Sequence, residues 1–364
     1  MNSEFIYDTT LRDGEQMPGV VFSKEEKIRL AKIISDFGAG IIGLMPSVSE
    51  AEREVTEHLA NCGLESQITA ATMMRRDDID TAKNCGVQRI ILFTSVSDIH
   101  IEKKLQTTRK ATLEKAVKFV EYAKEQGVAV DFAGEDSTRA DFDFLVKFIN
   151  SLDGRIDYFL PCDTLGILTP WQTYDLVRKL KQETDCQIGL HIHNDLGQAT
   201  ASTLAGIEAG ADLFSGTFTG IGERAGNVPL EEVVMALRTQ HNKMLDVKYE
   251  LIWKICYLVQ QYSGVRLQKH KPISGVNAFS HESGTHVDGV LKASENYENF
   301  DPRIIGGKRE ILFGKCSGRG GLRYLFKDRF TDEQYVEMLK EIKLRAEAEK
   351  RAFTEEEIRE MFLR

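Results

Sequence analysis

Eight short runs of β-forming residues, each followed by a segment of helical period, occupy the first two thirds of this 364-residue chain. Eight such units of about 30 residues match a (β/α)8 barrel of about 250 residues. The alternative, a doubly wound sheet, favours a G-x-G-x-x-G after the first strand, where this chain has TTLRD. We therefore predict an α/β fold, a (β/α)8 TIM barrel over residues 1–248. The predicted strands are residues 5–8, 40–44, 67–71, 89–94, 129–133, 158–161, 187–193 and 213–217, and the predicted helices are residues 24–37, 49–62, 77–85, 112–126, 140–152, 171–183, 199–209 and 230–240.

The alternation of strands and helices stops near residue 249, which predicts an appended, α-rich region over residues 249–364. One helix is predicted at residues 249–262, and a stretch rich in Gly, Ser and His follows it. Two helices close the chain, and each begins with a capping-box pattern in which Thr precedes Gln or Glu by three residues. These patterns are Thr331 with Gln334 and Thr354 with Glu357.

Charge and composition limit the partners of the protein. The 47 Lys and Arg residues against 56 Asp and Glu leave a net charge of -9, which argues against general binding to nucleic acid or to an anionic membrane. No apolar run approaches the ~18 residues of a membrane span, and the first residues lack the pattern of a signal peptide. The six cysteines form no C-x-x-C pair, so we expect reduced, mostly buried thiols. We therefore expect a soluble, cytoplasmic protein whose partners are small molecules or other subunits.

Polar residues follow several predicted strands at the ends where barrel active sites form. His191 and His193 are two positions apart on the seventh strand, so their side chains point to the same side. Together with Asp13, which follows the first strand, they predict a divalent metal site with two His ligands and one carboxylate. Asn227 ends a Gly-rich loop after the eighth strand and offers a further neutral oxygen. Taken singly, each of these residues also has a structural explanation, as a helix N-cap or a buried histidine.

Several long motifs in the chain resemble one known family. YDTTLRDGEQMPGV (residues 7–20), LHIHNDLGQATA (190–201) and GIGERAGNVPLEEVVMAL (220–237) resemble the Claisen-condensing acyltransferases of the DRE-type metallolyase barrel superfamily. These are the homocitrate, isopropylmalate and citramalate synthases of amino-acid biosynthesis. The resemblance continues in FSHESGTHVDGVLK (279–292), YENFDP (297–302) and FGKCSGR (313–319). GEDSTRAD (134–141) and DTLGILTPWQTYDLV (163–177) look most similar to nitrogenase-associated homocitrate synthases.

The resemblance implies a metal-dependent activity with named site residues. Asp13, His191 and His193, with Asn227 or water, would hold a divalent ion (Zn, Mn, Mg or Co) that chelates the keto oxygen and carboxylate of a 2-oxo acid. Arg12 would stabilise the alkoxide that forms when the carbonyl is attacked.

The resemblance also assigns the proton transfers and the second substrate. Glu135, His286 and Tyr297 match the residues that move protons at the methyl group of the co-substrate acetyl-CoA. Thr164 matches a hydroxyl that binds the substrate carboxylate. His286 and Tyr297 lie in the appended region, which in relatives reaches over the barrel of a partner subunit, so the resemblance implies a homodimer with composite sites.

The leading functional hypothesis is an acetyl-CoA:2-oxo-acid C-acetyltransferase of the homocitrate-synthase type, acting on 2-oxoglutarate and hydrolysing the CoA thioester. An isopropylmalate or citramalate synthase is the near alternative, and a lyase or an inactive paralogue is a more distant one. If 2-oxoglutarate is the substrate, its second carboxylate needs a partner, and His100 after the fourth strand is the best candidate.

Three positions depart from the family pattern. Ile42 stands where relatives have an active-site Glu, which predicts a less acidic pocket. Asp131 stands where eukaryotic-type homocitrate synthases have an Arg for the second carboxylate. Cys316 replaces a His that is common in relatives.

Overall fold

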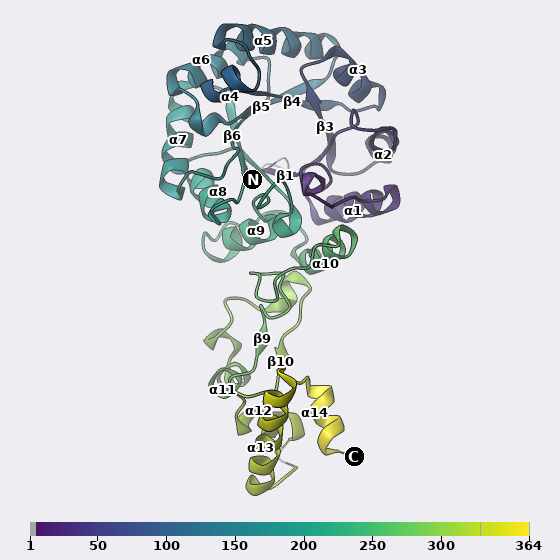
Figure 1. Cartoon of the computed structure of the whole chain (residues 1–364), viewed down its shortest axis with the longest axis vertical. Coiled ribbons are helices and arrows are strands. Elements are labelled where there is room, and N and C mark those ends of the chain that lie inside the picture. The colour runs from purple at the N-terminus through teal and green to yellow at the C-terminus, as the bar shows by residue number, and fades with distance from the viewer. Residues whose placement is uncertain (1–4, 328, 364) are drawn as a thin grey trace. The chain divides into compact units, whose positions relative to one another are not determined.

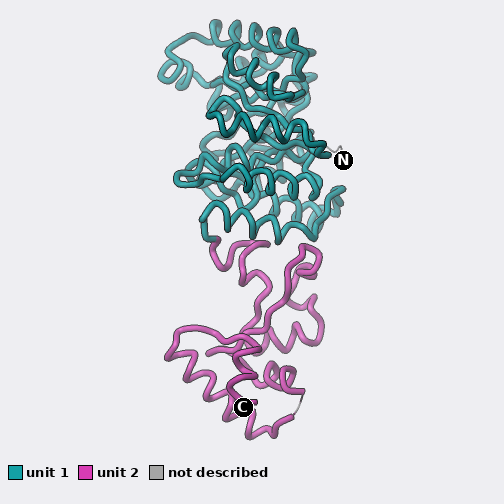
Figure 2. The backbone as a smooth tube through the Cα atoms, turned by 90° about the vertical axis from the view of Figure 1, so that its right-hand side faces the viewer, with its two compact units in different colours: residues 1–266 teal, residues 267–364 magenta. Residues whose placement is uncertain are grey.

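The computed structural model describes residues 5–327 and 329–363, which divide between Arg266 and Leu267 into two compact units (Figure 2). The sequence placed this division at residue 248. It lies later because helix α10 (Ile252–Ser263) packs against helix α1 (Lys24–Phe37) of the first unit. Residues 1–4, on which the expected lack of a signal peptide partly rests, lie outside the described residues. Within the described residues, no helix is long and apolar enough to cross a membrane.

The first unit is a closed barrel of eight parallel strands (Figure 1). The strands follow one another around the ring in chain order, and β1 pairs with both β2 and β8. This closure confirms the predicted TIM barrel and excludes the doubly wound sheet. The strands are β1 (Ile6–Asp8), β2 (Ile41–Leu44), β3 (Gln67–Met73), β4 (Arg89–Ser95), β5 (Ala129–Glu135), β6 (Tyr158–Asp163), β7 (Gln187–Ile192) and β8 (Leu213–Gly216).

A helix predicted from the sequence follows each strand and covers the outside of the ring (Figure 1). Side-chain caps define many of the helix starts, such as the Ser23 capping box of α1 and the Thr169 capping box of α7. A short helix that periodicity did not predict, α4, lies between β4 and α5. The other helices of this unit are α2 (Glu50–Asn61), α3 (Arg76–Asn84), α4 (Asp98–Lys103), α5 (Arg109–Glu125), α6 (Phe142–Leu152), α7 (Pro170–Glu183), α8 (Ala199–Glu208) and α9 (Leu230–Thr239).

Hydrogen bonds of Thr9 and Thr10, which follow β1, connect this loop to the end of β8 and the residues after it. The Thr9 hydroxyl donates to the Gly216 carbonyl at 3.0 Å. Asp8 accepts from the Thr10 backbone N–H at 3.0 Å and from the Thr10 hydroxyl at 2.8 Å. The same hydroxyl accepts the backbone N–H of Phe218 at 2.9 Å. The loop that carries the next polar residues is therefore fixed across the seam where the barrel closes.

The second unit has a core of its own. A two-stranded parallel sheet, β9 (Ser280–His281) and β10 (Glu310–Ile311), is accompanied by helices α11 (Gly284–Lys292), α12 (Arg319–Phe326), α13 (Asp332–Glu349) and α14 (Glu355–Phe362). Capping boxes at Thr331 and Thr354 begin the last two helices, as predicted. The buried side chains include Phe313, Leu322, Tyr335, Phe353 and Ile358.

Glycines hid α11 and α12 from prediction, because glycine disfavours helices. In the structure they permit close packing. A Cβ on Gly284 would lie 2.8 Å from the Gly318 backbone, and one on Gly321 would lie 3.2 Å from the Phe313 ring.

All six cysteines are free thiols, as the sequence predicted. Four are buried, and Cys62 and Cys316 are exposed.

We predict that Thr10→Ala destabilises the barrel, whereas Thr10→Ser does not. The alanine removes the hydrogen-bond partner of the Phe218 N–H and one partner of the Asp8 carboxylate. Each buried group left unsatisfied lowers the free energy of unfolding by about 1–3 kcal/mol. Serine keeps the hydroxyl and serves as the matched control. Urea denaturation of the full chain measures both, and equal stability of the two variants would contradict this account.

Candidate metal and catalytic site

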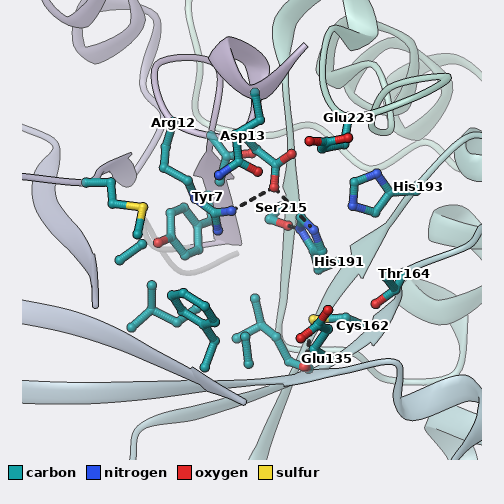
Figure 3. A pocket seen from close by; sticks show the side chains of 18 of the residues that line it. Tyr7, Arg12, Asp13, Glu135, Cys162, Thr164, His191, His193, Ser215 and Glu223 are labelled. Atoms are coloured by element: carbon teal, nitrogen blue, oxygen red, sulfur yellow. Dashed lines mark hydrogen bonds and ion pairs between the residues drawn. The ribbon is translucent and has the colours of Figure 1, made fainter. Parts of the chain in front are cut away.

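A cavity of about 350 Å³ opens at the carboxyl ends of the barrel strands (Figure 3). Its wall combines polar residues from the strand ends and loops with apolar residues of the barrel interior. The polar lining includes Thr9, Arg12, Asp13, Gln16, Lys104, Glu135, Thr164, His191, His193, Ser215, Glu223 and Arg224, and the apolar lining includes Tyr7, Met45, Ala71, Ile91, Phe93, Ala133, Leu160 and Cys162.

The structure brings Asp13, His191 and His193 together at one side of this cavity (Figure 3). One ligand atom from each residue lies within 4.8 Å of the others. Among the described residues, His193 Nδ1 and Asn227 Oδ1 are buried without a hydrogen-bond partner, which is unfavourable unless another group satisfies them. Two imidazoles, a carboxylate and an unsatisfied amide oxygen are suitable donors for a divalent cation. The residues present therefore fit the predicted metal site.

Neighbouring polar groups orient two of the three ligands. His191 Nδ1 lies 2.8 Å from the Ser215 hydroxyl, and its Nε2 faces Asp13 Oδ2 at 3.5 Å. When Nδ1 carries the proton, it donates to Ser215 and leaves the Nε2 lone pair for a metal. The Asn227 amide nitrogen donates to Asp13 Oδ1 at 3.0 Å. Asn227, predicted as an oxygen ligand, thus also positions the carboxylate of Asp13.

The electrostatics of the site favour the metal-binding form of each ligand. Burial alone would raise the pKa of Asp13, but Arg12, whose Nη1 lies 2.7 Å from Oδ2, and the two histidines lower it to about 2. Burial lowers the pKa of His191 to about 3 and also lowers the pKa of His193. At neutral pH the site therefore holds one carboxylate and two neutral imidazoles.

Glu135 lies at the end of β5 and lines the cavity. The Ser95 hydroxyl donates to its Oε2 at 2.6 Å, and Lys104 Nζ contacts its two oxygens at 2.5 and 2.7 Å. Burial would raise the pKa of Glu135, but the bonds from Lys104 and Ser95 outweigh it and lower the pKa. Glu135 is therefore an anion at neutral pH. No local pattern in the sequence indicates a role for Lys104, because it lies at the end of the short helix α4, which periodicity did not predict.

The loop after β8 contributes Glu223 and Arg224, which sequence analysis also left without a role. Arg224 donates to both oxygens of Asp195, at 2.8 and 2.9 Å, and to the Thr164 carbonyl. The loop turns tightly because Gly226 has a φ of +91° and a Cβ there would lie 1.9 Å from the Gly220 carbonyl oxygen. The Gly-rich pattern of residues 220–227 predicts the turn from the sequence, but it does not indicate a role for Arg224 inside that turn.

Thr164 lines the cavity, and its hydroxyl accepts the backbone N–H of Asp136 at 2.8 Å. His100, by contrast, is not among the lining residues. It lies in α4, where its Nδ1 is 3.3 Å from the Ser95 hydroxyl and its Nε2 is 3.4 Å from Arg139 Nη2. His100 therefore lies behind Glu135 and not at the wall of the cavity.

The structure corrects the prediction drawn from Ile42. Strand alternation turns Ile41 into the barrel interior, where it packs in the core cluster with Tyr7, and turns Ile42 away. Ile42 is fully buried and does not line the cavity, so its side chain has no bearing on the acidity of the pocket. Asp131 does not line the cavity either, and it accepts a hydrogen bond from Arg89 Nη1 at 2.8 Å.

His286 and Tyr297 belong to the second unit, where their rings stack with centroids 4.1 Å apart and planes 17° from parallel. Both side chains are exposed. A Cβ on Gly289 would lie 2.4 Å from the Tyr297 ring, so the stack requires glycine at that position of α11. Next to Tyr297, Glu298 binds His281 at 3.2 Å and Arg309 Nε at 2.6 Å. These contacts hold the pair at the surface of its unit.

Comparisons with known proteins identify relatives of both units. A family model described as HMGL-like matches residues 5–259, and one described as homocitrate synthase post-HMGL domain-like matches residues 273–350. The chain is 41% identical over 343 residues to a putative (R)-citramalate synthase of Methanothermobacter thermautotrophicus, covering 93% of this chain and 69% of the relative. It is 39% identical to a probable 2-isopropylmalate synthase of Methanopyrus kandleri, with the same coverage. A homocitrate synthase of M. thermautotrophicus is 41% identical and covers 86% of this chain and 81% of the relative.

Solved structures agree on the fold. The crystal structure of the HMG-CoA lyase of Bacillus subtilis matches with a TM-score of 0.64 at 20% identity, covering 72% of this chain and 94% of the lyase. The lyase of Brucella melitensis matches with a TM-score of 0.62 at 17% identity, covering 71% and 98%. At identities of 20% and 17%, the structural similarity supports the barrel fold and carries no information about the activity of this chain.

We predict that binding of a divalent cation to this site at pH 6 releases less than one proton from its ligands. Two histidines with the usual pKa of about 6.5 would together release about 1.5 protons per ion at that pH. Here burial lowers the pKa of both histidines, so fewer protons remain to be released. Calorimetric titration of the metal-stripped protein with Mn²⁺ or Zn²⁺ in two buffers of different ionisation enthalpy measures the release. A release of one proton or more would contradict the predicted charge state.

Proposed function

The chain belongs to the HMGL-like family, in the group of citramalate, 2-isopropylmalate and homocitrate synthases, and on this premise we propose that it condenses acetyl-CoA with a 2-oxo acid. In this Claisen condensation the acetyl methyl carbon attacks the keto carbon, and hydrolysis of the CoA thioester follows. The observation that carries the proposal is the convergence of Asp13, His191 and His193 with Arg12 and Glu135 on one cavity.

Asp13, His191 and His193 would hold the divalent ion, with Asn227 or water completing its coordination. The ion, when bound, polarises the keto carbonyl of the chelated 2-oxo acid as a Lewis acid. The protein's own contribution is to fix the substrate next to Arg12. Among the described residues, Arg12 Nε is buried without a hydrogen-bond partner, while Nη1 is held by Asp13. Arg12 therefore has an N–H to donate to the keto oxygen as that oxygen becomes an alkoxide.

We assign proton removal from the acetyl methyl group to Glu135. Its lowered pKa keeps it ionised at neutral pH, and it lines the cavity across from the metal ligands (Figure 3). Thr164 would bind the substrate carboxylate, because its oxygen accepts the Asp136 N–H and its own hydrogen remains available to donate.

His286 and Tyr297 would complete the proton path from a second subunit. Their exposure and mutual stacking support a role at a shared site, because two polar rings held rigidly at a surface are available to a neighbour. We therefore propose a homodimer with composite sites. Free thiols throughout the chain fit a reducing compartment, the cytoplasm.

The relatives differ in the 2-oxo acid that their names imply, so identity alone does not select among citramalate, 2-isopropylmalate and homocitrate formation. The 2-oxoglutarate hypothesis drawn from the sequence relied on His100 at the cavity wall. The position of His100 behind Glu135 removes that support.

We predict metal-dependent thiol release from acetyl-CoA in the presence of a 2-oxo acid. His191→Ala should lower kcat/KM at least about a thousandfold, because it removes a ligand of the ion that activates the carbonyl. His58→Ala, at an exposed histidine of α2, is the matched control and should behave as wild type. A panel of 2-oxo acids with 5,5′-dithiobis(2-nitrobenzoate) detection measures the rate. Full activity in excess chelator would refute the proposal.

We predict that two inactive variants complement each other. His286→Ala and Asp13→Ala damage different halves of a composite site, so a hybrid dimer contains one site with both wild-type residues. The two variants are mixed with different tags, and the doubly tagged dimer is isolated. Because one of its two sites is intact, it should show up to about half of the activity of the wild-type dimer. The two parent homodimers are the controls. A purified hybrid as inactive as its parents would place all catalytic residues of a site in one chain.

A further inference from the structure

We propose that the 2-oxo acid carries an uncharged, apolar side chain, and that this side chain packs against the wall formed by Tyr7, Met45, Ala71, Ile91, Phe93 and Leu160. The inference rests on the proposed function and names the substrate class of the same site.

The apolar wall is continuous with the barrel core. Ala71, Ile91 and Leu160 are 1–2% exposed and belong to one buried cluster that also holds Tyr7. Met45 and Phe93 are partly buried and pack against this cluster at the cavity. The wall comes from β1 to β6, whereas His191 and His193 end β7. A 2-oxo acid chelated at the metal ligands therefore has an apolar surface within the same cavity for its remaining substituent.

The cations that line the cavity are already engaged by carboxylates. Arg12 keeps an N–H at Nε, but the proposed mechanism uses it for the keto oxygen. At the remaining donors a second substrate carboxylate would have to displace a paired carboxylate and leave it without its own cation, which is unfavourable in a partly buried site. The three pairs are Arg12 with Asp13 at 2.7 Å, Lys104 with Glu135 at 2.5 Å, and Arg224 with Asp195 at 2.8 Å.

The neutral polar groups near the wall do not replace a cation. Burial raises the pKa of the Tyr7 phenol far above its usual value, so the hydroxyl stays neutral. The other neutral polar side chains of the lining, Thr9, Gln16, Thr164 and Ser215, also balance no charge, and His100 lies outside the lining of the cavity. The wall therefore disfavours a dicarboxylate and favours a hydrocarbon substituent.

Small residues set the space for this substituent. Ala71 and Ala133 line the cavity, and Gly43 lies so close to the Tyr7 ring that a Cβ there would be 3.0 Å from Cε2. Each methylene buried against such a wall changes affinity by about fourfold. We expect kcat/KM to rise from pyruvate through 2-oxobutyrate to 2-oxoisovalerate until the substituent fills the space.

The test compares two substrates of matched shape. In 5-methyl-2-oxohexanoate an isopropyl group replaces the second carboxylate of 2-oxoglutarate, so the pair differs mainly in charge. Thiol release from acetyl-CoA by the wild-type, metal-loaded enzyme should favour the apolar member by at least about a hundredfold in kcat/KM. Equal or greater use of 2-oxoglutarate would overturn the inference while leaving the proposed condensation intact. Failure of every 2-oxo acid, pyruvate included, would instead refute the condensation.

A charge placed in the wall gives an independent test. Met45→Lys should shift the ratio of the two kcat/KM values toward 2-oxoglutarate by at least about tenfold, because it supplies the missing cation. Met244→Lys makes the same substitution at an exposed methionine and should leave the ratio unchanged. Thermal unfolding of both variants establishes that they are folded. An unchanged ratio in folded Met45→Lys would show that the substituent binds elsewhere.

Discussion

The Thr10 hydroxyl joins the first and last strands of the barrel, and the site depends on that joint. It donates to Asp8 and accepts from the Phe218 N–H, two residues more than 200 positions apart in the chain. Burial raises the pKa of Asp8 to about 7, and the two bonds from Thr10 oppose that rise. The segment that follows carries Arg12 and Asp13. Their approach to the histidines of β7 therefore requires that the barrel be closed and its seam be hydrogen bonded.

Paired charges explain why so polar a cavity is compatible with a stable barrel. Each cation that lines it lies against a carboxylate, and each imidazole is neutral because burial lowers its pKa. Three buried atoms that lack a hydrogen-bond partner among the described residues, His193 Nδ1, Asn227 Oδ1 and Arg12 Nε, belong to the proposed metal and oxyanion site. The Tyr7 hydroxyl at the cavity wall is a further one, and others, such as Thr72 Oγ1 and Thr203 Oγ1, lie elsewhere in the barrel unit. A bound metal and substrate would supply partners for the atoms of the site.

Periodicity predicted the barrel because each of its strands and its main helices has a local pattern, and element bounds differ from prediction by only a few residues. The metal ligands could also be predicted from the sequence, since the alternation of side chains along a strand fixes the side to which His191 and His193 point. Three features lay beyond that reasoning. Lys104 reaches Glu135 through a short helix without a strong period, Ile42 was matched to an active-site position of relatives although alternation turns Ile41 to the interior, and α11 and α12 contain glycines that serve close packing. For Lys104 and for the two helices a contact distant in sequence determines the outcome, whereas the side to which Ile42 points follows from alternation within β2.

In the proposed function, the division of the chain into two units separates two sets of catalytic groups. The barrel unit holds every group that would activate the 2-oxo acid, from the metal ligands to Arg12. The second unit, stabilised by its own core around Tyr335 and Phe353, presents His286 and Tyr297 as a rigid stacked pair supported by Gly289. A rigid support matters because proton transfer requires hydrogen-bond distances at the reacting carbon. Because Glu135, the group proposed to take the methyl proton, lies in the barrel, His286 and Tyr297 would complete the proton path from it only where both subunits are in place.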